Sequence, residues 1–468
     1  MPDDDKPKAA AKPPTSRFGR LARLTGLAPR AIPIASEAVR KAIGGPRTEE
    51  EEKAARKRMR AEAQKTAQVM LKTLGEMKGL PLKLGQMASY IDGLAPPGYE
   101  EKFQATLKKL QSKAPPLSPE AARKVILEDL REPPEKIFAE WEEEPFAAAS
   151  IGQVHRATTR GGDRVAVKVQ YPGIDKAIEN DLKSLSLMES MIAPIGRRYH
   201  TKETLDEIRE VFLAELDYRI EAETAEIFRK IHADYPAIVI PRVHHSLTTR
   251  RVLVNELVLG EDYATFAARA DQGERDVASV TVWRFMFRAL FVYGMLYADP
   301  HPGNYRFLGG DRVAFLDFGC RKILTPDFVA GMKRYAVAAM DEDWPEFYRA
   351  CAEVLGYDPT DEAAWHLYTE YTKLLLLPLT QHGTYKHTRE AARETIAFLV
   401  RGGKEIWKKK DDEIIPDLPK PIDVPRDFTF ISRLQWGLAS VMGGLGGEGE
   451  YRKMTEPWVR GPVLPLPT

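Results

Sequence analysis

Residues Arg164–Gln170 read Arg-Val-Ala-Val-Lys-Val-Gln, with a valine at every second position. This alternation predicts a β-strand that presents its three valines on one face. The preceding run Gln153–Thr158 and the turn Gly161-Gly-Asp163 predict a hairpin that ends in this strand. A lysine inside an apolar strand costs free energy unless its ammonium group reaches water or an anion. Lys168 is therefore either a surface lysine with a buried stem or a ligand of an anionic group.

The composition fits a folded protein of more than one domain. The chain has 468 residues, 43% of them hydrophobic and 29% charged, with a formal net charge of +1. These values exclude a disordered or collagen-like chain, and the balanced charge gives no support for a nucleic-acid partner. No uninterrupted apolar run reaches the roughly 18 residues that span a bilayer. Cys320 and Cys351 are the two cysteines, and the start has no signal-peptide pattern, so we expect a reducing, cytoplasmic location.

The first 60 residues are basic, with 15 Lys and Arg against 8 Asp and Glu. Residues 1–16 are rich in Pro, Ala, Lys and Asp and predict disorder. From Arg17 to Ile43, apolar residues alternate with arginines, which predicts a basic amphipathic segment. Such a segment can lie peripherally on an anionic membrane surface, or it can pack against its own protein with its arginines in water.

Patterning along the chain predicts an α+β protein. It divides into a disordered and basic N-terminus (1–48), a helical extension (49–140), a strand-rich part with a helical insert (141–260), a mainly helical part (261–446) and an irregular tail (447–468). Within the third part we expect helix over 174–232 and strands at 242–245 and 251–256. Within the fourth we expect a strand pair at 305–307 and 313–316.

A loop of small residues, Ala147-Ala-Ala-Ser150, comes just before the predicted hairpin. Small side chains allow the backbone to approach a phosphate group closely. Taken alone, this loop is weak support for a phosphate site.

Two further motifs carry side chains with oxygen atoms. Asp299 and Asn304 are five residues apart in a loop rich in proline, and Asp317-Phe-Gly follows a predicted strand. An Asp-x4-Asn spacing is typical of phosphotransferase loops, where the aspartate orients the acceptor and the asparagine holds a metal. Mg²⁺ prefers carboxylate, amide and phosphate oxygens, so Asp317 can complete its ligands. Lys168 and these two motifs, in this order, predict a site for a magnesium-bound nucleotide.

Together with Lys83-Leu-Gly-Gln86 and Glu215-Leu-Asp217, these motifs resemble those of the UbiB-type, or AarF-domain, atypical kinase family. The resemblance covers residues 60–330 well and the rest more loosely. It implies a protein-kinase-like bilobal α+β fold, with a small mixed β-sheet N-lobe, a mainly helical C-lobe and a helical N-terminal extension. The chain departs from the family pattern at Tyr297, where histidine is expected, and at Gly152, where alanine is more usual.

The resemblance also implies roles for individual residues. Lys168 would contact the phosphates of ATP and pair with Glu221, Asp299 would be the catalytic aspartate, and Asn304 and Asp317 would hold Mg²⁺. The remaining expected nucleotide contacts are Ala147, Ala148, Ala149 and Ser150 in the loop, and Glu256 and Val258 in the adenine-binding hinge.

The Lys83 segment is expected to have a regulatory effect. By the resemblance, Lys83 and Gln86 would cover the place where a peptide substrate docks, with Lys83 tethered to Glu215. Residues two apart on a helix do not point the same way, whereas Asp217 and Glu221, four apart, can. Glu215 and Glu221 can therefore meet different partners, although an exposed acidic helix is the alternative for all three.

The chain has no room for a long activation segment, because Thr325-Pro326 starts a predicted helix soon after Gly319. Phosphorylation of other proteins is therefore not expected. We predict an ATP- and Mg²⁺-dependent atypical kinase or ATPase, which the resemblance links to isoprenoid-quinone (ubiquinone-type) or other lipid metabolism, with an isoprenoid or phenolic lipid as a partner. The alternatives are a catalytically weak nucleotide-binding scaffold for lipid enzymes, a protein Ser/Thr kinase, and an aminoglycoside-type phosphotransferase. The oligomeric state stays open.

Overall fold

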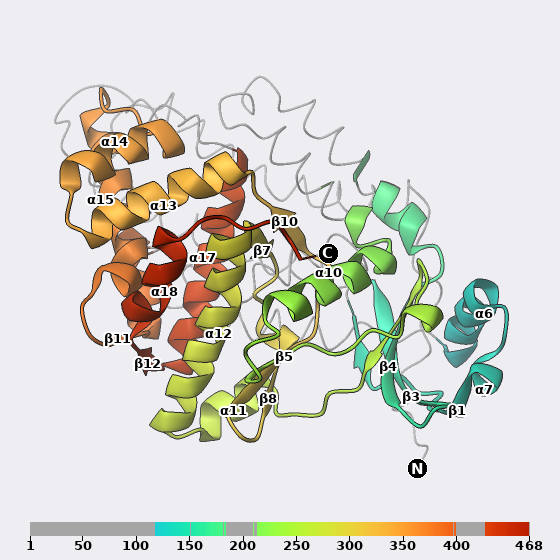
Figure 1. Cartoon of the computed structure of the whole chain (residues 1–468). Helices are drawn as coiled ribbons and strands as arrows, with labels where there is room; N and C mark the ends of the chain where they lie inside the picture. Colours follow the sequence, from blue (N-terminus) through green and yellow to red (C-terminus); the bar gives the residue numbers. More distant parts are fainter. Residues whose placement is uncertain are drawn as a thin grey trace, which may run out of the picture. The chain divides into compact units, whose positions relative to one another are not determined.

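Figure 1 shows the computed structural model of the chain, which describes residues 118–149, 151–180, 182–183, 209, 213–395, 397–398 and 426–467. The predicted N-terminal segments, with Lys83 and Gln86, lie outside the described residues, and so does Ser150. The described residues fall into two compact units. The first takes in 118–162 and 167–183, and the second takes in 163–166 and everything from residue 209 onward.

The first unit is a small antiparallel sheet with two flanking helices. Its elements are α6 (Pro119–Leu130), α7 (Pro134–Ile137), β1 (Phe138–Trp141), β2 (Ala147–Ala148), β3 (Gly152–Thr159) and most of β4 (Arg164–Gln170). Both β1 and β2 pair antiparallel with β3. The predicted hairpin is confirmed, and in β4 the three valines are buried while Lys168 is half-buried.

The second unit is mainly helical. Its strands are β5 (Ile238–Val239), β6 (Val252–Glu256), β7 (Met295–Tyr297), β8 (Tyr305–Leu308), β9 (Arg312–Phe315), β10 (Arg321–Ile323), β11 (Tyr385–Lys386) and β12 (Glu448–Gly449). Its helices are α10 (Tyr218–Ile231), α11 (Tyr263–Arg269), α12 (Gln272–Tyr293), α13 (Pro326–Met340), α14 (Trp344–Leu355), α15 (Glu362–Thr380), α17 (Arg426–Leu445) and α18 (Tyr451–Arg460), with 3-10 turns η2 (His245–Leu247) and η3 (Pro302–Asn304). The α+β fold class is confirmed.

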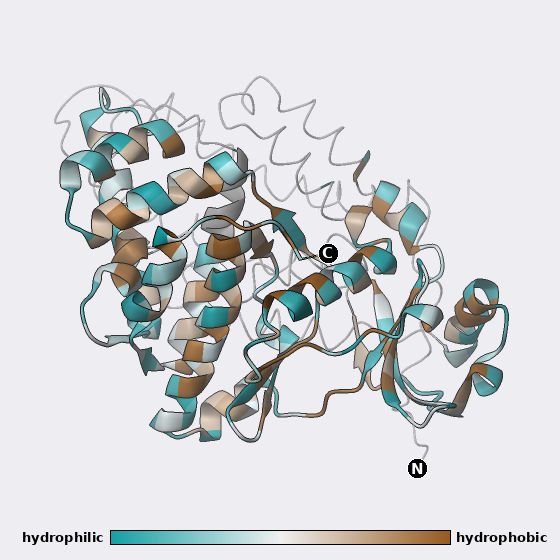
Figure 2. Ribbon diagram, in the orientation of Figure 1, coloured by the Kyte–Doolittle hydropathy of each residue, from teal (hydrophilic) through white to brown (hydrophobic). Residues whose placement is uncertain are grey.

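Helix α10 starts at Tyr218, inside a longer helix that the sequence predicts. Residues 215–217 break the predicted 174–232 helix, because Asp217 has extended backbone and its side chain accepts a hydrogen bond from the Arg219 N–H. Aspartate is a favoured N-cap for this reason. Figure 2 shows both hydrophilic and hydrophobic residues along α10. Although Glu221 is charged, it lies on the buried side of this helix. The cap therefore fixes where α10 begins, and with it the position of Glu221 in the first turn of this helix.

Helix α12 is the central helix of the second unit, and Figure 1 shows it beside α17 and α18. Asp271 and Glu274 form a reciprocal capping box at its start. At its end Gly294 has φ of 64°, a left-handed conformation that glycine adopts without strain. The chain then turns directly into β7, so the end of α12 determines where the following loop begins.

A buried aromatic cluster packs the second unit around this turn. Ring centroids are 3.6 Å apart for Phe285 and Phe315, 5.1 Å for Phe285 and Tyr297, and 5.6 Å for Tyr297 and Phe318. Phe228 of α10 joins the cluster at 5.2 Å from Phe285. Aromatic pairs of this kind contribute about 0.5–1.5 kcal/mol each beyond the area they bury. Phe318 and Tyr297 lie next to the two predicted motifs, so the cluster holds both motifs on one core.

Two predictions of local structure are wrong. The tail after Gly446 is not wholly irregular, because Tyr451–Arg460 form α18, which packs on α12. The predicted strand 242–245 is reduced to one bridge, between Val243 and Asn255. Both errors arise where contacts with distant residues, rather than the local pattern, decide the structure. Within the described residues, the helices are all too short or too polar to cross a membrane.

Candidate active site

Two strand pairs bring the predicted catalytic and metal motifs together. β7 pairs antiparallel with β10, which places Tyr297 opposite Arg321, and β8 pairs antiparallel with β9, which places Tyr305 opposite Phe315. Asp299 therefore leaves the first pair at the end where Gly319 enters it. Asn304 precedes the second pair at the end where Asp317 leaves it. The register of four short strands thus brings the loop 299–304 next to the Asp317-Phe-Gly motif.

Hydrogen bonds fix the loop that carries Asp299 and Asn304. The Asn304 Nδ2 atom donates to the Asp299 carbonyl oxygen at 3.0 Å, and the Leu316 N–H donates to the Asn304 carbonyl at 3.0 Å. The His301 Nδ1 atom accepts from the Gly303 N–H at 2.9 Å and so supports the η3 turn. With Nδ2 engaged, the side-chain oxygen is the atom that Asn304 can offer to a cation.

Gly319 is the place where three acidic side chains converge. A Cβ atom added there would lie 3.2 Å from Asp317 Oδ1, 3.4 Å from Glu221 Oε2 and 3.7 Å from Glu215 Cγ. The Gly319 N–H also donates to Asp317 Oδ1 at 2.9 Å. Glu215 and Glu221 are 6% and 5% exposed, so their carboxylates are held inside the protein. A larger residue at this position would crowd the Asp317 carboxylate.

Tyr297, the departure from the family pattern, is 2% exposed beside this loop. Burial, together with neighbouring Tyr305, Asp317 and Asp299, raises the pKa of Tyr297 well above its ordinary value. The Tyr297 hydroxyl is therefore protonated and neutral at neutral pH. In this form it can donate a hydrogen bond or accept one, but it carries no charge. The substitution leaves the loop with a neutral phenol where the family would have an imidazole.

These side chains fit a divalent cation that is bound partly by its nucleotide. Among the described residues, His, Cys, Asp and Glu side chains do not form a group of three arranged to hold a metal on their own. Mg²⁺ keeps several waters and usually takes one or two protein oxygens together with phosphate oxygens. One amide oxygen from Asn304 and the Asp317 carboxylate meet that need.

The predicted phosphate-binding residues belong to the sheet of the first unit. In the first unit, Lys168 is on β4, and Ala147 and Ala148 form β2. The Ala149 N–H donates to the Gly152 carbonyl at 2.8 Å and closes the tip of the β2–β3 hairpin, so the small-residue loop is a tight turn.

In the second unit, the Asp217 carboxylate is engaged with the Arg219 side chain as well as the α10 backbone, at 2.6 Å from Arg219 Nη2. Hydrogen bonding to Arg219 lowers the pKa of Asp217. Glu256 ends β6, its N–H bound to the Arg242 carbonyl, and Val258 follows in the connecting segment, half-buried.

The converging role of Gly319 was missed by the sequence prediction, which used only the aspartate of the Asp-Phe-Gly motif. The sequence did offer one indication, because the motif ends in glycine, the residue with the smallest side chain. The contribution of Phe318 to the aromatic cluster had no signal beyond its hydrophobicity.

The family profile described as the ABC1 atypical kinase-like domain matches residues 109–351. The chain belongs to the ABC1 atypical kinase-like family. The resemblance expected from the motifs is thereby confirmed, and the match includes Lys168, Asp299, Asn304 and Asp317.

Individual relatives agree with this family membership. The chain is 33% identical over 291 residues to the uncharacterized protein slr0889 of Synechocystis, covering 59% of this chain and 70% of that protein. It is 31% identical over 334 residues to the mitochondrial atypical kinase COQ8B of rat, covering 71% of this chain and 62% of the rat protein. Other curated relatives are matched over about half of their length.

A solved structure shares the fold. The Mycobacterium tuberculosis protein Rv3197, determined in complex with erythromycin, superposes with a TM-score of 0.59 at 24% identity, covering 89% of this chain and all of that one. At this level of identity the likeness concerns the fold.

Proposed function

We propose that this ABC1-family chain is an ATP- and Mg²⁺-dependent atypical kinase or ATPase. The observation that carries the proposal is the convergence of Asp299, Asn304 and Asp317 through two strand pairs and the Asn304–Leu316 hydrogen bond. These are the side chains that phosphoryl transfer needs, and they come from two separate segments, the loop 299–304 and the Asp317-Phe-Gly motif.

Each residue has a stated task in this proposal. Asn304 and Asp317 hold the cation, which neutralises charge on the phosphate oxygens when it is bound. Asp299 orients the acceptor hydroxyl or water and takes up its proton. Lys168 would bind the phosphates and pair with Glu221, and the small side chains of Ala147–Ala149 would let the backbone approach the phosphates closely. Glu256 and Val258 would contact the adenine ring.

A small acceptor or water fits the site better than a protein substrate. Only residues 320–325 separate Gly319 from α13, and β10 occupies half of them. A conventional protein kinase uses a long segment at this point to hold its peptide. We propose in addition that the Lys83 segment limits access to the site, with Glu215 as the partner of Lys83.

We further propose that the activity supports isoprenoid-quinone or other lipid metabolism at a membrane surface. The basic segment of the first 60 residues supports a peripheral association with anionic lipid.

The experiment that tests the enzymatic proposal is Mg²⁺-dependent hydrolysis of ATP by the purified chain. Asp317→Asn should reduce the rate at least a hundredfold, because an amide is a poorer magnesium ligand than a carboxylate. Asp311→Asn is a matched control, since Asp311 is exposed at the β8–β9 turn with a φ of 62° that asparagine tolerates. Equal rates in the wild type and Asp317→Asn would reject the assignment.

A further inference from the structure

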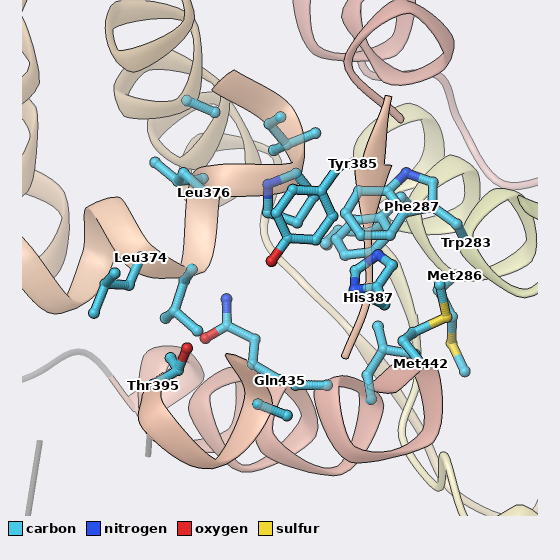
Figure 3. Close-up of a pocket in the computed structure, with 18 of the residues that line it drawn as sticks. Trp283, Met286, Phe287, Leu374, Leu376, Tyr385, His387, Thr395, Gln435 and Met442 are labelled. Carbon is cyan, nitrogen blue, oxygen red and sulfur yellow. The ribbon is translucent and has the colours of Figure 1, made fainter. Parts of the chain in front are cut away.

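A cavity of about 140 Å³ lies among the helices of the second unit, apart from Asn304 and Asp317. Residues from α12, α13, α15, β11 and α17 line it, and Figure 3 shows a part of these walls. Neither of the proposed metal ligands contributes to its lining. Tyr297 and Pro300 also line it, so the cavity borders the loop that carries Asp299 and Asn304, but none of the proposed nucleotide or metal contacts is part of its wall.

The cavity wall is apolar and uncharged. Trp283, Phe287, Leu376 and Met442 are typical of it, and the lining residues in the described part of the chain include no Asp, Glu, Lys or Arg. An ion inside such a wall would lose its hydration without gaining a partner. The walls therefore favour a neutral ligand and disfavour a nucleotide, a fatty-acid carboxylate or a phospholipid headgroup.

Several polar side chains interrupt the apolar wall, including Tyr297, Tyr385, His387, Thr395 and Gln435. Gln435 Oε1 and His387 Nε2 are buried, and neither has a hydrogen-bond partner in the described part of the chain. Figure 3 shows the Gln435 amide and the Tyr385 hydroxyl pointing into the pocket. Burial lowers the pKa of His387 to about 3, so its ring is neutral at physiological pH. A buried polar atom without a partner is costly and calls for an explanation, and a carbonyl oxygen can be satisfied only by a donor.

The volume sets the size of the ligand group that the pocket can enclose. A cavity of about 150 Å³ lined by leucine, isoleucine and phenylalanine accommodates benzene. We propose that this pocket binds a neutral, largely apolar molecule of about one ring in size, whose hydroxyl group donates a hydrogen bond to Gln435 Oε1. The ring packs against the aromatic wall formed by Trp283 and Phe287.

Three probes test the parts of this proposal separately. Toluene tests the apolar ring, benzyl alcohol adds the hydroxyl group, and benzoate carries a charge that the wall should exclude. We measure the affinity of each for the full chain, without nucleotide, by ligand-observed nuclear magnetic resonance. The expected order is benzyl alcohol three- to tenfold tighter than toluene, because of one added hydrogen bond, with no measurable binding of benzoate. Benzoate binding as tightly as benzyl alcohol would overturn the inference.

Two variants locate the binding. Gln435→Leu should keep toluene bound while it removes the advantage of benzyl alcohol over toluene. Ala391→Leu, in the pocket wall, should weaken both neutral probes at least tenfold by filling the space, whereas Ala363→Leu on the exposed side of α15 should leave them unchanged. An unchanged advantage in Gln435→Leu, or unchanged affinities in Ala391→Leu, would contradict the proposal.

Discussion

At the residue scale, Gly319 shows how the smallest side chain can be essential to a charged site. Its Cα is the point around which Asp317, Glu221 and Glu215 gather, and a methyl group there would meet two carboxylate oxygens at 3.2 and 3.4 Å. The shorter contact requires the Asp317 carboxylate to shift by a few tenths of an ångström, and this group is a proposed metal ligand whose placement matters for catalysis.

Gly319→Ala is therefore expected to lower Mg²⁺-dependent ATP hydrolysis at least tenfold while the protein stays folded. The matched control is Gly309→Ala, because a Cβ at Gly309 meets nothing within 4 Å. Steady-state rates and circular dichroism of both variants check this. A Gly319→Ala enzyme as active as Gly309→Ala would show that the carboxylates are not held where we place them.

His232 gives a second residue-scale prediction, for the pH dependence of stability. Burial first, and then the charge of Arg288, lowers the pKa of His232 to about 3. In the unfolded chain its pKa is about 6.5, so between these values the unfolded state binds a proton that the folded state does not. The stabilising contribution is complete above pH 6.5 and is lost progressively as the pH falls toward 3.

Urea denaturation at pH 7 and pH 5 measures this contribution. His232→Phe should fit between Phe228 and Phe285, whose ring centroids are 6.3 and 5.1 Å from the imidazole. The wild type should lose about 2 kcal/mol more unfolding free energy than His232→Phe between the two pH values. Parallel losses in both proteins would mean that His232 does not titrate as described.

At the element scale, a capping box fixes where α12, the helix that leads to the catalytic loop, begins. The Glu274 N–H donates to Asp271 Oδ1 at 2.9 Å, and the Asp271 N–H donates to Glu274 Oε2 at 3.0 Å. Asp271→Ala removes one of these bonds and should lower the free energy of unfolding by about 1 kcal/mol. Asp271→Asn keeps a capping oxygen and should remain close to the wild type. Chemical denaturation checks both, and equal stability of Asp271→Ala and the wild type would argue against the cap.

Elements with a strong local pattern could be predicted from the sequence, and others could not. The alternation in β4 and the Thr325-Pro326 start of α13 are local signals, and the structure confirms both. Helix α18 has Pro457 inside it and low hydrophobicity, so its packing on α12 had no local signal. The break before α10 depends on Asp217 accepting backbone hydrogen bonds, which competes with continued helix.

At the scale of the whole molecule, the order of motifs predicted the family, whereas the pocket could not be predicted. The Lys, Asp-x4-Asn and Asp-Phe-Gly motifs are short, and it is their order along the chain that indicates the family. The pocket unites residues from 283 to 442, whose apolar side chains are typical of any core. Tertiary packing alone distinguishes a cavity from a filled interior.

Membrane association is a prediction for the whole chain. Deleting residues 1–46 should weaken co-sedimentation with vesicles that contain anionic lipid, and added salt should weaken binding of the intact chain. Vesicles of neutral lipid are the control, because they lack the attracting charge. Equal co-sedimentation with and without the segment would remove the case for a basic membrane anchor.

The central claim is that Asn304 and Asp317 share one cation with a bound nucleotide. Calorimetric titration of ATP in the presence and absence of Mg²⁺ tests this most directly, because it needs no turnover. We expect Mg²⁺ to tighten ATP binding to the wild type at least tenfold and to have little effect on Asp317→Asn. An equal effect of Mg²⁺ on both proteins would contradict the account.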